Sequence, residues 1–138
     1  MRHVMLKEYN GRIYDPIHTD DYGMDVLAYW FAHDVRDNTN GWIKWISEDS
    51  YEDTESNATW LEKYWSDEGT CEIIFGSLSD MAQTSRGKIY VPKEERTITI
   101  LKGNVIDLLN SWERLLKTHP KQIMITEENG IYKMFEVQ

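Results

Sequence analysis

The chain has 138 residues, of which 41% are hydrophobic and 12% aromatic, and this indicates one globular domain over residues 1–138. Its net charge of -9 disfavours direct binding to nucleic acid and to anionic membranes. The single cysteine, Cys71, excludes an internal disulfide, and the sequence lacks the apolar runs of a signal peptide or a transmembrane helix, which favours a cytoplasmic protein.

The first elements expected are a short strand or hairpin and then a helix. Apolar residues flank Asn10-Gly11, a dipeptide that favours a tight hairpin turn. From Met24 to Val35 apolar residues recur every three or four positions, which predicts a helix. The alternative is a strand, because VLAYWF is rich in strand formers and Asn40-Gly41 could turn the chain into a hairpin.

A short helix and three strands are expected next. Ser56 or Asn57 can cap a helix that runs through Trp65, and Gly69 would end it. The segments CEIIFG, GKIYVP and TITIL then predict strands from their β-branched and aromatic content, and the polar sequence KEER predicts a turn.

The strongest element is a long helix at about residues 104–118. Its apolar residues form one stripe, Asn104 and Asp107 are expected to cap its start, and Lys117, His119 and Pro120 mark its end. The last two apolar runs flank Asn129-Gly130 and predict a closing hairpin. Together these elements predict an α+β fold in which the long helix covers a mostly antiparallel sheet, with one or two shorter helices.

Negative charge is concentrated in one half of the sequence. Residues 15–80 contain sixteen acidic side chains and only three basic ones, whereas the rest of the chain is net basic. The densest stretch, SEDSYEDTESNATW, carries five carboxylates and no Lys or Arg. A cationic surface is the natural complement of such a field, although many charged runs serve only solvation.

Aromatic residues among these acids favour a protein partner over mere solvation, because large rings bordered by charge are typical of interfaces. We expect the carboxylates to pair with Lys or Arg of the partner, and an indole to provide the buried anchor. The predicted partner-binding residues are Glu48, Asp49, Glu52, Asp53, Glu55, Trp60, Trp65, Asp67 and Glu68.

Catalytic signatures are absent from the sequence. It has no GxxxxGK[ST], GxGxxG, GxSxG or HExxH pattern, and we expect neither a catalytic site nor a cofactor. The alternative is a small metal-dependent hydrolase that uses His18, His33 and nearby carboxylates. Another is an acidic adaptor or inhibitor from a mobile element, which would use the same kind of surface on a different target.

The C-terminal half adds a family resemblance. The strand KIYVP, the segment ERTITILKGNVIDLLNSWERLLK and the strand KQIMITEENG form an arrangement that resembles small immunity proteins of bacterial polymorphic or contact-dependent toxins. The resemblance covers roughly residues 70–137. It implies a cytoplasmic, non-enzymatic inhibitor that covers the active site or substrate groove of a basic nuclease toxin.

Overall fold

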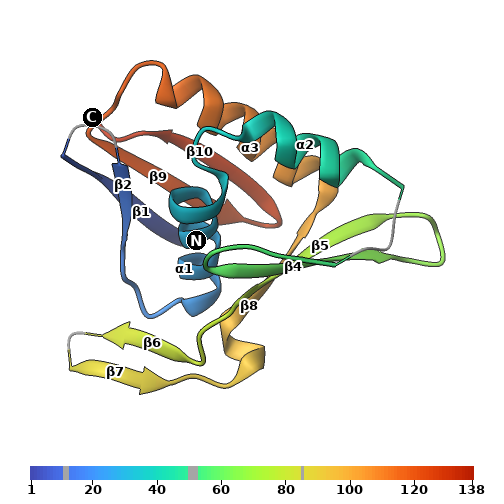
Figure 1. Cartoon of the computed structure of the whole chain (residues 1–138), viewed down its shortest axis with the longest axis horizontal. Coiled ribbons are helices and arrows are strands. Elements are labelled where there is room, and N and C mark those ends of the chain that lie inside the picture. Colours follow the sequence, from blue (N-terminus) through green and yellow to red (C-terminus); the bar gives the residue numbers. More distant parts are fainter. Residues whose placement is uncertain (11–12, 50–52, 85) are drawn as a thin grey trace.

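The computed structural model describes residues 1–10, 13–49, 53–84 and 86–138. Within them lie two four-stranded antiparallel sheets, a separate two-stranded hairpin, and helices, some of which pack between the sheets (Figure 1). The predicted α+β class is confirmed, although the strands form more than the single sheet that the sequence suggested.

Sheet A joins the two ends of the chain in the order β10-β9-β1-β2. β1 (Arg2–Tyr9) and β2 (Ile13–Ile17) form the first hairpin, and β9 (Gln122–Glu128) and β10 (Ile131–Glu136) form the last. Asn129 and Gly130 have φ angles of 54° and 81°, the left-handed values that a tight hairpin turn requires. Both hairpin predictions are confirmed.

Sheet B has the order β3-β4-β5-β8. Its strands are β3 (Thr54–Glu55), β4 (Thr59–Trp65), β5 (Cys71–Ser77) and β8 (Thr97–Leu101). β5 and β8 confirm the strands predicted from CEIIFG and TITIL. The helix expected from Ser56 or Asn57 through Trp65 is wrong, since burial in β4 alternates with period two. Asn57 caps no helix, because its side-chain amide donates to the carbonyl of His33.

A short hairpin lies apart from both large sheets. β6 (Met81–Thr84) was not predicted. It pairs with β7 (Gly87–Tyr90), which was predicted as a strand from the segment GKIYVP. The predicted turn KEER forms the 3₁₀ helix η2 (Lys93–Arg96). The Arg96 guanidinium binds the base of the hairpin, since its Nε donates to the Val91 carbonyl and its Nη1 to the Ser77 carbonyl.

The helix predicted from Met24 to Val35 is confirmed. Asp21 caps the start of α1 (Tyr22–Tyr29), because its carboxylate accepts a hydrogen bond from the Met24 amide at 3.2 Å. The helix continues as the π-helix η1 (Trp30–Val35). α2 (Thr39–Ser47) follows, so the alternative hairpin at Asn40-Gly41 is wrong.

The long helix is α3 (Lys102–Leu116). Asn104 and Asp107 do not cap it, because the helix begins two residues earlier than Asn104, and the Asn104 amide donates instead to the carbonyl of Gly130 at 3.0 Å. The end is as predicted: Leu116 is the last helical residue, Lys117 caps the helix, and His119 takes a φ of 49° before Pro120.

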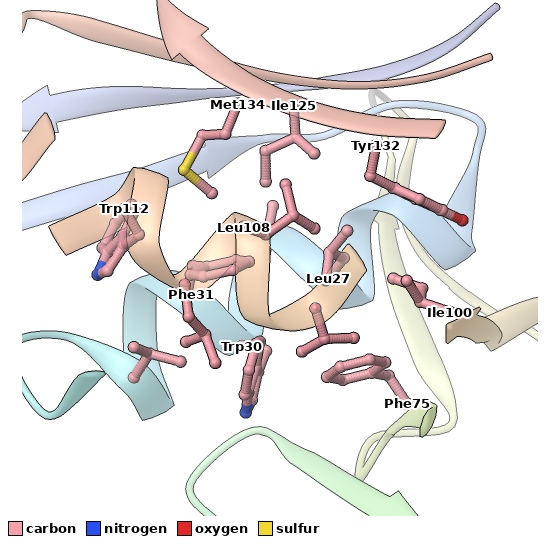
Figure 2. Packing of buried hydrophobic residues seen from close by; sticks show 14 of the residues in the cluster. Leu27, Trp30, Phe31, Phe75, Ile100, Leu108, Trp112, Ile125, Tyr132 and Met134 are labelled. Atoms are coloured by element: carbon pink, nitrogen blue, oxygen red, sulfur yellow. The ribbon is translucent and has the colours of Figure 1, made fainter. Parts of the chain in front are cut away.

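One hydrophobic core lies where the inner faces of both sheets meet α1, η1 and α3 (Figure 2). Trp30 is fully buried and contacts Phe31 and Phe75 edge-on, with ring centroids 4.9 and 4.8 Å apart. Trp112 of α3 is also buried, and its indole nitrogen donates to the Arg36 carbonyl at 2.6 Å. The four other tryptophans are half-buried, so the indoles are not all sealed inside the protein.

Candidate functional site

The outer face of sheet B is the surface that gathers acidic and aromatic side chains. Along β4, Thr59, Leu61 and Lys63 are buried toward the core, so the alternate residues point the other way. The pairing register places the following residues on that side, which we call the sheet B face: Glu55, Trp60, Glu62, Tyr64, Glu72, Ile74, Gly76, Thr97, Thr99 and Leu101.

Trp60 is the central ring of the sheet B face. It lies over Gly76 on the neighbouring strand, where a Cβ would come within 2.0 Å of two ring carbons. The Lys93 ammonium lies 5.1 Å from the centroid of the same indole. Glycine therefore leaves the space that lets the indole lie flat on the sheet, and the ring is held as a rigid, half-buried anchor.

Two further apolar side chains accompany Trp60. Tyr64 is 56% exposed and Leu101 47% exposed, and Glu72 lies between them in the register. The combination of exposed rings and aliphatic groups is suited to burial against another protein.

The charge of the sheet B face is negative. Glu55, Glu62 and Glu72 belong to three different strands, and none of them forms a salt bridge to another described residue. These glutamates can therefore pair with cations of a partner without first breaking an internal ion pair.

The predicted partner-binding residues are only partly brought together. Asp53, Glu55 and Trp60 line one hollow of about 490 Å³ beside Glu62 and Lys93. Glu48 and Asp49 are exposed where α2 ends, and Asp67 and Glu68 are exposed in the turn between β4 and β5. Glu52 lies outside the described residues.

Trp65 does not lie on the sheet B face. It points to the inner side of β4, is half-buried against the hydrophobic core, and has the Lys102 ammonium 5.5 Å from its ring centroid. Its role is packing, so Trp60 is the better anchor. The predicted partner-binding residues did not include Glu62, Glu72 or Tyr64. If TWLEKYW had been interpreted as a strand, its alternation would have placed Glu62 and Tyr64 on the same side as Trp60.

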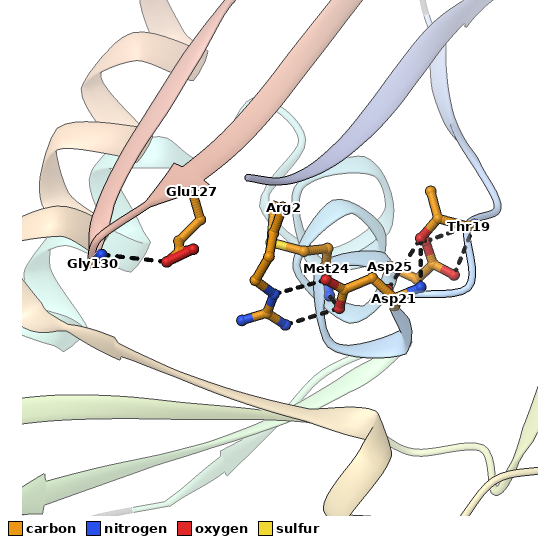
Figure 3. A network of polar contacts seen from close by, with 7 residues as sticks. All are labelled: Arg2, Thr19, Asp21, Met24, Asp25, Glu127 and Gly130. Atoms are coloured by element: carbon orange, nitrogen blue, oxygen red, sulfur yellow. Dashed lines mark hydrogen bonds and ion pairs between the residues drawn. The ribbon is translucent and has the colours of Figure 1, made fainter.

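Several other acids of the negative half have structural roles. The Asp34 carboxylate accepts hydrogen bonds from the Ala58 amide at 3.0 Å and from the Thr59 hydroxyl, which ties η1 to the start of β4. Asp21 forms a bidentate ion pair with Arg2, at 2.7 and 2.8 Å. This ion pair and the neighbouring Thr19–Asp25 contacts hold the loop before α1 (Figure 3).

Asp25 illustrates the cost of burying such a group. It is 7% exposed, and burial raises the pKa of its carboxyl above the ordinary value, while hydrogen bonds from Thr19 act in the opposite direction. The Thr19 hydroxyl donates to its Oδ1 at 2.9 Å. These acids therefore contribute less to a docking surface than the sequence implied.

The histidines of the alternative hydrolase lie on either side of one tyrosine. The Tyr29 hydroxyl is 3.0 Å from His18 Nε2, and its ring stacks on His33 with centroids 5.4 Å apart. His33 Nε2 is 3.9 Å from an Asp15 oxygen. No group of three or more His, Cys, Asp or Glu side chains in the described ranges is arranged to hold a metal ion.

His18 and Tyr29 also line a cavity of about 360 Å³ between α1 and the β6–β7 hairpin, together with Asp25, Lys88 and Arg96. Its wall carries both signs of charge. The Asp25 carboxylate accepts hydrogen bonds from Thr19, and the Arg96 guanidinium donates to two backbone carbonyls. These two charged groups are therefore already hydrogen-bonded within the protein and are less available to a substrate.

No protein-family model matches this chain, and searches among curated proteins and solved structures found no similar protein. No helix in the part of the chain that the structure describes is long and apolar enough to cross a membrane. The function must therefore be inferred from the chemistry of the sheet B face.

Proposed function

We propose that this chain is an immunity protein, a non-enzymatic cytoplasmic inhibitor that binds and neutralises a basic toxin through the sheet B face. The observation that carries the proposal is the position of Trp60 and Tyr64 among Glu55, Glu62 and Glu72 on an outer sheet face. A rigid indole within a ring of charge is the usual composition of a binding hot spot.

A nuclease is the toxin class that fits this surface best. A nuclease needs cationic side chains to hold the phosphates of its substrate, and an anionic sheet can occupy that groove in place of nucleic acid. The same field would draw the partner in, since complementary charge raises association rates by about 10- to 1000-fold. Rapid capture protects a cell that produces both proteins.

Binding and neutralisation of the neighbouring gene product test this proposal. We expect the chain to co-purify with that product as a salt-sensitive complex and to protect cells from it. Trp60→Ala should weaken binding by about 10- to 100-fold, because a central aromatic anchor typically contributes about 2 kcal/mol or more.

Tyr9→Ala is the matched control, because Tyr9 is a 60% exposed aromatic residue on sheet A, away from the sheet B face. It should leave binding unchanged. Equal losses from both variants would remove the sheet B face from the proposal. A salt-sensitive complex with a basic protein that is not toxic would favour the acidic adaptor or mobile-element inhibitor instead.

A further inference from the structure

The outer face of sheet A carries a row of apolar side chains that crosses all four strands. The register aligns Ile17 of β2, Met5 of β1, Met124 of β9 and Phe135 of β10 side by side. Ile17 and Phe135, at the two ends of the row, are 44% and 43% exposed. Met5 and Met124, in the middle, are half-buried.

The helices cover the opposite side of this sheet. Residues that alternate with the row, among them Leu6, Ile123 and Ile125, are fully buried in the core. On the outer side, Tyr9, Ile13 and Ile131 add further exposed apolar area around the row. An apolar surface of this extent commonly marks a protein interface.

We propose that this sheet A face binds the same face of a second copy of the chain, around a two-fold axis that runs parallel to the strands between β1 and β9. Such an axis places β2 opposite β10 of the other copy, and β1 opposite β9. Ile17 then meets Phe135 of the second copy, and Met5 meets Met124, allowing for the roughly 30° rotation between packed sheets.

The charges on the sheet A face favour a second copy as the occupant. The same axis places Lys7 opposite Gln122 and His3 opposite Thr126, so neither of these basic side chains lies directly opposite a like charge. A two-fold axis across the strands would instead bring Lys7 toward His3.

The size of the face sets the expected strength. Eight residues of β1 span about 27 Å, and four strands about 4.8 Å apart span about 19 Å. The area enclosed by these two lengths is smaller than the area that each partner buries in most stable interfaces, which is about 800 Å². The dimer should therefore form reversibly, in the micromolar range.

A charge-swap experiment tests both the dimer and its orientation. Sedimentation of the wild-type chain should show a concentration-dependent monomer–dimer equilibrium. The double variant Ile17→Lys, Phe135→Lys places ammonium groups opposite each other, and should weaken dimerisation by about 100-fold or more. The double variant Ile17→Lys, Phe135→Glu places opposite charges together and should recover most of the loss.

The control pair Tyr64→Lys, Leu101→Lys adds the same charges on the sheet B face and should leave the dimer intact. Circular dichroism would verify that each variant is folded. A wild-type chain that stays monomeric at high micromolar concentration would overturn the proposal. Equal losses in both sheet A variants would overturn the orientation, because Ile17 would then meet Ile17, and Phe135 would meet Phe135.

Discussion

The contact between Trp60 and Gly76 gives a sharp test of how the sheet B face is built. A Cβ at Gly76 would lie 2.0 Å from Cε2 and Cζ2 of Trp60, and 2.5 Å from its indole nitrogen. Carbon atoms in contact are about 3.5–4.0 Å apart, so in Gly76→Ala the ring must retreat by about 1.5 Å or more. This movement also disturbs the Lys93 contact.

The size of the effect follows from two opposing contributions. Overpacking of this kind costs about 1–3 kcal/mol. Replacing a glycine inside an extended strand restores about 0.5–1 kcal/mol, because the unfolded chain loses freedom. Gly76→Ala should therefore lower the free energy of unfolding by about 1 kcal/mol, and by about 2.5 kcal/mol at most.

A double-mutant cycle isolates the contact. In a Trp60→Ala background the clash is absent, and the same Gly76→Ala change should be neutral or stabilising. Urea unfolding followed by circular dichroism measures all four proteins without relying on tryptophan fluorescence. If Gly76→Ala destabilises both backgrounds equally, the indole does not lie over this glycine and the reasoning is refuted.

Two further predictions concern the acids with structural roles. Asp34→Ala should lower the free energy of unfolding by about 1–3 kcal/mol, because it leaves the buried Thr59 hydroxyl without its partner; exposed Asp37→Ala should change little in the same urea titration. The hydrogen bonds from Arg2 hold the pKa of Asp21 below its ordinary value of 3.8. That contribution is present above the unfolded pKa and is lost as the pH falls through the lower folded pKa. Arg2→Met should thus lower the free energy of unfolding, measured by urea titration, more at about pH 5 than at about pH 2. The difference should be about 1 kcal/mol or less, because both side chains are partly exposed. An equal loss at both pH values would contradict this role for the ion pair.

Most of the elements that were predicted correctly have a clear local signal in the sequence, such as one hydrophobic periodicity or a characteristic turn dipeptide. The long helix and the closing hairpin are examples, because an apolar stripe and Asn129-Gly130 each specify one local geometry. The segment from Thr59 to Trp65 was ambiguous, since its large residues suit either a short helix or a strand. Pairing with β5 decided in favour of the strand, and such long-range pairing has no local signal.

The choice between helix and strand for this segment also decided which residues could be predicted to share one surface. A helix would have placed Glu62 on the side opposite to Trp60 and Tyr64, whereas a strand places all three on one side. The uneven distribution of charge is evident from the sequence, but the hydrogen bonds that Asp21, Asp25 and Asp34 form within the fold are not. Those partners come from segments that are distant in sequence or lie around a loop.

The most direct test of the central proposal is the association rate with the basic partner, measured as a function of salt. Glu62→Lys, Glu72→Lys should slow association by about tenfold or more and flatten its salt dependence, because it reverses two charges on the sheet B face. Asp20→Lys, Asp37→Lys changes the net charge equally but at exposed sites elsewhere, and should have a much smaller effect. Equal slowing by the two pairs would show that overall charge, and not the sheet B face, draws the partner in.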